Sequence, residues 1–151
     1  MQKSFIMLQP IAIGCDHAGF IFKESIKSWL EKKGLRVVDF GTSSEQSVDY
    51  PDFVHPVCKA IEIGEAEIGI LLCGTANGVA MTANKHAKIR AGLCWENEIA
   101  ALTRKHNDAN IICIPARFVS LDLSLQMIET FMSTEFEGGR HQNRVDKISC
   151  N

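Results

Sequence analysis

Residues 68–73 read IGILLC and pass directly into GTANG at residues 74–78. Six residues of almost continuous apolar character are typical of a strand that is buried on both faces of a parallel sheet. The small, glycine-punctuated turn is typical of a connection from such a strand into a helix, which we expect to begin near Asn77. This stretch therefore predicts an α/β fold with an exposed turn at the strand's carboxyl end.

Four other runs share the character of this strand. Each is short, apolar and rich in β-branched residues or cysteine, and together with 68–73 they predict strands at 11–15, 36–40, 90–94 and 110–114. Helical patterns separate them. The alternation predicts a single-domain, doubly wound, Rossmann-like α/β sandwich with a five-stranded, mainly parallel sheet.

The helical patterns lie between the predicted strands and after the last one. Apolar residues recur at helical spacing at Phe22, Ile26, Trp29 and Leu30, with Gly34 placed to end that helix. A second apolar stripe follows the sequence DYP and consists of Val54, Val57, Cys58 and Ile61. A third follows Ser120, which is placed to cap the last long helix, and consists of Leu121, Leu125, Ile128 and Met132.

The overall composition limits the classes of function. The chain has 151 residues, 46% of them hydrophobic, and a formal net charge of −2, so no broad positive field favours nucleic acid or a membrane surface. No apolar run approaches the length of a membrane helix, and the first residues lack a signal-peptide pattern. Six scattered cysteines without a CxxC pair favour a reducing, cytoplasmic compartment. We expect an N-terminal extension at 1–9 and one domain at 10–151 that ends in a basic tail.

Polar residues follow the predicted strands where those strands end. Because the carboxyl ends of parallel strands meet at one edge of a sheet, we expect these residues to line one crevice. The set consists of Asp16, His17, Tyr50, Cys73, Thr75 and Asn77.

Within this set, the glycine turn and Cys73 each allow two interpretations. Gly74 and Gly78 either expose backbone amides to an anionic oxygen or simply permit tight packing. The turn is neither a dinucleotide GxGxxG pattern nor a P-loop. Cys73 is either an apolar filler or a thiol whose ionised form is favoured beside a helix N-terminus. The arginine of a CxxxxxR phosphatase loop is absent, and no neighbouring cysteine is placed to resolve a redox step, which leaves proton abstraction.

Histidines and arginines form the remaining candidates. His17 and His106 each lie among carboxylate and amide side chains, although a loop histidine is often only solvated. No HExxH-type pattern accompanies them, so we expect no metal. Arg140 and Arg144 are four residues apart and would share a helix face, where they could clamp one phosphate or stay solvated. Arg117 follows the fifth strand and could join them.

Several motifs together resemble the ribose-5-phosphate isomerase B family, part of the wider RpiB/LacAB group of sugar-phosphate isomerases. The motifs agree with the family in order and spacing over nearly the whole chain after Pro10. They are IAIGCDHAGF, DFGTSSEQSVDYPDF, ILLCGTANGVAMTANKHAKIRAGLC, RKHNDANIICIPAR and FEGGRHQNRVDKI.

The resemblance implies an aldose–ketose isomerase that interconverts D-ribose 5-phosphate and D-ribulose 5-phosphate in the non-oxidative pentose phosphate pathway without a cofactor. It implies that Cys73 is the base that moves the proton and that His106 opens the sugar ring. Thr75 would assist at the enediolate, and Asp16 also joins the catalytic candidates. The other residues implied around the sugar are His17, Gly74, Ala76, Asn77, Gly78 and Asn107, together with Tyr50 from the sheet edge; Arg117, Arg140 and Arg144 would hold the phosphate.

The resemblance also implies a homodimer or homotetramer whose sites take residues from both subunits. One position departs from the family, because the loop commonly has glycine where this chain has Ala76. If that residue needs a positive φ, alanine adds about 1 kcal/mol of strain and could adjust substrate preference or rate. Two alternatives stay open: an isomerase of a six-carbon aldose phosphate, such as galactose 6-phosphate or allose 6-phosphate, and a non-catalytic flavodoxin-like binding module.

Overall fold

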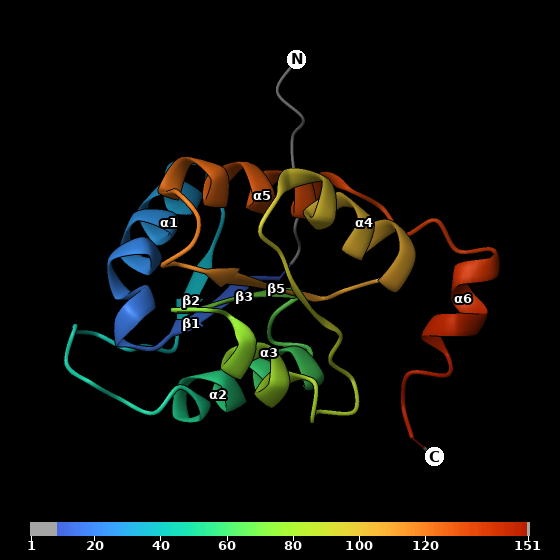
Figure 1. Ribbon diagram of the computed structural model, residues 1–151, viewed down its shortest axis with the longest axis horizontal. Helices are drawn as coiled ribbons and strands as arrows, with labels where there is room; N and C mark the ends of the chain where they lie inside the picture. Colours follow the sequence, from blue (N-terminus) through green and yellow to red (C-terminus); the bar gives the residue numbers. More distant parts are fainter. Residues whose placement is uncertain (1–8, 151) are drawn as a thin grey trace.

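Five strands form one sheet at the centre of the molecule (Figure 1). The structure is a computed structural model that describes residues 9–150, so residues 1–8 of the predicted extension lie outside the described residues. All pairings are parallel, in the order β2-β1-β3-β5-β4, which confirms the predicted sheet. The strands are β1 (Ile11–Cys15), β2 (Val37–Asp39), β3 (Ile68–Cys73), β4 (Ala91–Leu93) and β5 (Ile111–Pro115).

Helices cover both faces of this sheet, as Figure 1 shows. One face carries α1 (Phe20–Lys32), α4 (Asn97–Asn107) and α5 (Leu121–Ser133). The other carries α2 (Pro51–Glu62) and α3 (Asn77–Ala83). A short 3-10 turn, η1 (His17–Gly19), links β1 to α1. None of the helices in the described part of the chain is long and apolar enough to cross a membrane.

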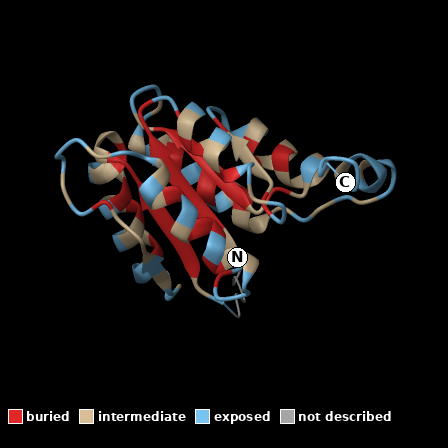
Figure 2. Ribbon diagram, turned by 90° about the horizontal axis from the view of Figure 1, so that it is seen from below, coloured by how far each residue is buried: buried red, intermediate tan, exposed pale blue. Residues whose placement is uncertain are grey.

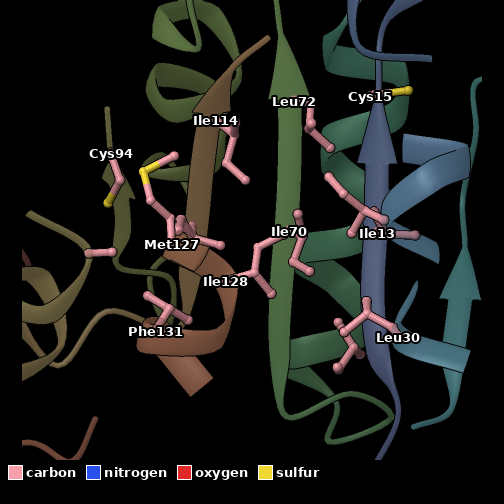
Figure 3. Close-up of a cluster of buried hydrophobic side chains, with 14 of the residues drawn as sticks. Ile13, Cys15, Leu30, Ile70, Leu72, Cys94, Ile114, Met127, Ile128 and Phe131 are labelled. Atoms are coloured by element: carbon pink, nitrogen blue, oxygen red, sulfur yellow. The ribbon is translucent and has the colours of Figure 1, made fainter. Parts of the chain in front are cut away.

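Side chains of the central strands alternate between the two helical layers. On β3, Ile70 and Leu72 pack with the α1, α4 and α5 layer, whereas Leu71 and Cys73 pack with α2 and α3. The first of these clusters is drawn in Figure 3, where Met127, Ile128 and Phe131 of α5 meet the sheet. The alternation places the thiol of Cys73 on the side where α2 and α3 begin.

The predicted helix ends are confirmed, and the predicted apolar stripe of α5 packs against the core but is not the most buried part of the helix. Gly34 has a φ of 80° just after α1, and the Ser120 hydroxyl accepts a hydrogen bond from the amide of Leu123. Of the predicted α5 stripe only Ile128 is fully buried, because the helix is rotated so that its buried residues are Ser124, Met127, Ile128 and Phe131. Leu121, Leu125 and Met132 are partly buried at the edge of the same cluster.

The last segment leaves the sandwich and forms the C-terminal arm, which we define as residues 134–150. Gly138 and Gly139 adopt positive φ values of 66° and 55° before the short helix α6 (Arg140–Val145). No residue of α6 is buried, and Figure 2 shows the arm projecting from the buried centre of the molecule. The predicted basic tail is therefore a helical arm attached to the body at its base.

Candidate active site

The carboxyl edge of the sheet brings Asp16 close to the end of β3. The amide of Asp16 donates to the carbonyl of Leu72 at 3.2 Å. One oxygen of its side chain, Oδ1, accepts from the amides of Ala18 at 2.9 Å and Gly19 at 3.3 Å, and so caps the turn η1. Asp16 is only 7% exposed. Its carboxylate is therefore held at the rim of the sheet in one orientation.

His17 is fixed by the loop that follows β2. The amide of Val48 donates to its Nδ1 at 3.2 Å, across 31 residues of sequence. Because Nδ1 accepts, the proton of the neutral ring is assigned to Nε2, which then serves as a donor. The same loop leads to Tyr50 at the start of α2. The segment that leads to Tyr50 therefore lies against His17 at this edge of the sheet.

Cys73 is the last residue of β3 and is 5% exposed. Its carbonyl accepts from the amide of Ala116 at 2.9 Å, which fixes the strand end against the segment after β5. The other buried thiols lie in apolar surroundings: burial raises the pKa of Cys15, Cys58 and Cys94 to about 12. Those three thiols stay protonated at neutral pH and act as apolar side chains.

The glycine loop at 74–78 is tightly enclosed by two larger side chains. A Cβ atom on Gly74 would lie 3.2 Å from the side chain of Arg117, and one on Gly78 would lie 2.5 Å from the ring of Tyr50. Asn77 donates its amide to the Thr75 hydroxyl at 3.3 Å and begins α3, as predicted. The small residues let Tyr50 and Arg117 approach the backbone beside Cys73.

Ala76 has a φ of 62° and a ψ of −2°. The residue at this position therefore does need a positive φ, where the family commonly has glycine. This left-handed conformation costs alanine about 1 kcal/mol relative to glycine. Ala76 is fully buried in the cluster that contains Cys73, Val79 and Ala83. Burial of its methyl group offsets part of the conformational strain. Its effect on rate or substrate preference stays a prediction.

A second group of predicted site residues lies at the end of α4 and on the C-terminal arm. His106 and Asn107 end α4, and with Arg144 they line a pocket of about 280 Å³ that is completed by His141, Val145 and Ile148. Arg140 lies on the same short helix as Arg144 and is exposed. Sequence reasoning missed His141, although its place next to Arg140 in GGRHQNRV puts it on the helix that carries the predicted arginines.

His106 and His141 are stacked, with ring centroids 4.2 Å apart and planes inclined by 14°. Glu137 approaches His141, with Oε2 3.7 Å from Nε2, and ligand atoms of these three residues lie within 4.8 Å of one another. Because the two rings are nearly parallel, their in-plane lone pairs do not converge on a single ion. The arrangement fixes the ring of His106 between α4 and the arm.

The two groups occupy opposite edges of the sheet. Asn110 follows the end of α4, and its carbonyl accepts from the amide of Gly69 at the start of β3, at 2.9 Å. Cys73 lies at the other end of that strand, roughly 13 Å from Gly69 at about 3.3 Å per residue. A single chain therefore brings Cys73 together with Asp16, His17, Tyr50 and Arg117, but not with His106, Asn107, Arg140 or Arg144.

The fold and these side chains define an α/β protein with acid–base groups and arginines suited to a small anionic ligand. The chain belongs to the ribose/galactose isomerase family, whose model matches residues 11–148. It is 43% identical over 143 residues to ribose-5-phosphate isomerase B of Escherichia coli, covering 95% of this chain and 96% of that protein.

Solved structures agree with this assignment. Ribose 5-phosphate isomerase from Thermotoga maritima is 47% identical, with a TM-score of 0.92 over 94% of this chain and 98% of that chain. The enzyme from Mycoplasma genitalium, solved with bound ribulose-5-phosphate, is 40% identical, with a TM-score of 0.89 over 94% and 95% of the two chains. The resemblance noted in the sequence is confirmed.

Proposed function

We propose that this protein is a ribose-5-phosphate isomerase of type B, which interconverts D-ribose 5-phosphate and D-ribulose 5-phosphate through an enediolate. The observation that carries the proposal is the thiol of Cys73 at the rim of β3, beside a glycine loop and the fixed side chains of Asp16 and His17. Relatives that are 40% or more identical over almost their whole length carry this activity in their names.

In this mechanism His106 moves the proton of ring opening, and Cys73 moves the proton between C2 and C1. His106 opens the furanose ring by proton transfer between the ring oxygen and the C1 hydroxyl. The Cys73 thiolate then removes the proton from C2 of the open aldose and returns a proton to C1 of the enediolate. Thr75 and the amides of the loop stabilise the negative oxygen while it exists. The proton count balances, because the hydroxyl at C2 loses the proton that the oxygen at C1 gains.

The phosphate would be held by Arg117, Arg140 and Arg144, whose guanidinium groups form charge-assisted hydrogen bonds with its oxygens. Arg140 and Arg144 stand on the arm, at the edge of the sheet opposite Cys73. We infer that the protein is a homodimer or a pair of dimers in which one copy supplies Cys73 and the other supplies His106 and the arm. The separation of the two groups and the unburied α6 support this assembly.

Subunit complementation tests the shared site. The Cys73→Ala and His106→Asn variants are each expected to be inactive, whereas a mixture that has been unfolded and refolded together should regain activity. Half of the dimers are then mixed and each mixed dimer has one intact site, so about one quarter of wild-type activity returns. A mixture no more active than its components would show that each site lies within a single copy.

Gly78→Ala probes the contact between the loop and Tyr50. The added methyl group displaces a ring that is 38% exposed, so the fold adapts and stability changes little. We expect KM for ribose 5-phosphate to rise about three- to tenfold, with a smaller change in kcat, because Tyr50 leaves its place beside the substrate. Tyr50→Ala should give the same rise, and the double variant no further rise. An unchanged KM in all three variants would remove Tyr50 from the site.

The six-carbon alternative is kept because the family model itself is described for both ribose and galactose isomerases. The deciding assay measures turnover of ribose 5-phosphate, galactose 6-phosphate and allose 6-phosphate by the same preparation, with EDTA present. Ribose 5-phosphate should have the highest kcat/KM. Turnover of a six-carbon substrate alone would replace the proposed substrate, and inactivity with all three would refute the isomerase.

The proposed place of action is the cytoplasm. Five of the six cysteines are buried and free, and Cys150 is exposed and free. Thiols in this state suit a reducing compartment. Pentose phosphates and their isomerisation also belong there under the proposed function.

A further inference from the structure

The end of α4, next to His106 and Asn107, has an uncommon backbone conformation. Asp108 has φ 47° and ψ 45°, one of only two residues other than glycine with positive φ in the described chain. Its amide donates to the carbonyl of Arg104 at 3.2 Å, and the amide of Ala109 donates to that of Thr103 at 3.1 Å. Aspartate adopts this conformation more readily than most residues, but glycine adopts it more readily still.

Aspartate at this left-handed position provides a carboxylate, which glycine would lack, and this carboxylate pairs with two arginines. Oδ2 pairs with Nη2 of Arg90 at 3.0 Å, and Oδ1 pairs with Nη1 of Arg104 at 3.1 Å. Nε of Arg90 also donates to the backbone carbonyl of Asp108 at 2.8 Å. These three side chains are only 19% to 33% exposed. One carboxylate therefore holds two half-buried guanidinium groups and fixes the left-handed residue itself.

Arg104 extends this network to the C-terminal arm. Its Nε donates to the carbonyl of Thr134 at 3.2 Å, and its guanidinium lies 5.6 Å from the centroid of the Phe131 ring. The amide of Glu137 donates to the carbonyl of Lys105 at 3.1 Å. The base of the arm is thus fastened to α4 within one turn of His106, and the same arm carries His141, which stacks on His106.

We propose that Asp108 is a positioning residue for His106 at the end of α4. Its carboxylate, held between Arg90 and Arg104, sets the end of α4 and the base of the arm against each other. The proposal rests on the proposed isomerase function. Asp108 touches no reacting atom in this arrangement, since both of its oxygens are directed to arginines.

The test uses Asp108→Gly and Asp108→Asn in the full-length protein. Glycine keeps the left-handed backbone without strain and removes the carboxylate; asparagine keeps the shape and removes the charge. Glu129→Gln is the matched control, because it breaks an exposed ion pair with Lys33 at 3.1 Å on a distant helix face. Thermal melting confirms that each variant is folded at the assay temperature.

The readout compares two reactions of ribulose 5-phosphate in D2O. Exchange of a C1 hydrogen for deuterium needs proton transfer by Cys73, whereas net formation of ribose 5-phosphate also needs the ring chemistry of His106. We expect both Asp108 variants to lower net isomerisation on the order of 10- to 100-fold and to raise the ratio of exchange to isomerisation about tenfold. A change in the fraction of folded protein cannot alter this ratio.

The outcomes distinguish a failure of the positioning role of Asp108 from a failure of the proposed isomerase function. His106→Asn should raise the same ratio, and Glu129→Gln should leave it at the wild-type value. If the Asp108 variants lose both reactions in equal proportion, or keep wild-type rates, the positioning role is wrong. If the wild-type protein catalyses neither reaction, the proposed function has failed instead.

Discussion

The Cys73→Ala variant is expected to fold normally, to bind ribose 5-phosphate, and to lose isomerase turnover by on the order of a thousandfold or more. The thiol lies at the end of β3 and is 5% exposed, so its removal leaves a small gap at the rim of the core rather than inside it. No neighbouring cysteine can replace it, because burial keeps the pKa of Cys15, Cys58 and Cys94 at about 12. Turnover is followed by steady-state kinetics and binding by calorimetry.

Cys58→Ala is the matched control for this variant. Cys58 is fully buried in the same apolar layer, on α2, and its thiol stays protonated at neutral pH. We expect its replacement to lower stability modestly and to leave kcat within about twofold of wild type, because no step uses it. Wild-type turnover by Cys73→Ala would remove the thiol from the mechanism. Equal loss in both variants would attribute the effect to packing.

Asp39→Asn is expected to lower the free energy of unfolding by about 3 to 5 kcal/mol. The ammonium group of Lys23 is 2.6 Å from Oδ2 of Asp39, and the lysine side chain is only 1% exposed. Glu24 pairs with the same ammonium at 2.6 Å but is half exposed, so it compensates the charge only in part. Neutralising Asp39 therefore leaves a buried cation without its main partner, and equilibrium unfolding in urea measures the loss.

The double variant Lys23→Met, Asp39→Asn separates loss of a partner from loss of packing. Because it removes the buried charge along with its partner, we expect it to recover most of the stability that Asp39→Asn loses. Oδ1 of Asp39 also accepts from the amide of Gly41 at 2.9 Å, and the asparagine carbonyl can keep that bond. A double variant as unstable as Asp39→Asn would show that the buried charge is not the cause.

The pH dependence of this pair has a definite sign. Burial opposes the charge of Asp39, but bonds from Lys23 and Gly41 and the charges of Lys23 and Lys27 outweigh it and lower its pKa. Its contribution to stability is therefore present above the unfolded pKa of about 3.9 and is lost as pH falls through the folded value. Burial likewise opposes the charge of Lys23, yet Asp39 and Glu24 raise its pKa, so its contribution is lost only as pH rises above about 10.4. The stability difference between wild type and Asp39→Asn should shrink as pH falls below about 4.

Much of the fold follows from sequence periodicity, because a strand buried on both faces must be apolar along its whole length. The five predicted strands all form, and β3 has its predicted bounds. The outer strands β2 and β4 are shorter than predicted, at Val37–Asp39 and Ala91–Leu93. Each pairs with a neighbour on one side only, so its pairing ends sooner than an apolar run suggests.

The site is predictable to the extent that it follows from strand ends. Asp16, His17, Tyr50 and Cys73 gather because parallel strands end at one edge. The sequence does not reveal that Lys23 is buried, because lysine normally stays exposed and its partner Asp39 is 16 residues away. It also does not reveal that the arm returns to α4, since that contact depends on Arg104 reaching the carbonyl of Thr134.

The placement of Cys73 and His106 at opposite edges of the sheet has a kinetic consequence. If a second copy completes each site, as proposed, then catalysis and self-association share one equilibrium. At high dilution most copies would be monomers, and the reaction rate would then vary with the square of the protein concentration rather than in proportion to it. A substrate that bridges two copies would oppose this dissociation, because each bound sugar phosphate favours the assembled form. The enzyme would then persist longest in its active form wherever its own substrate is abundant.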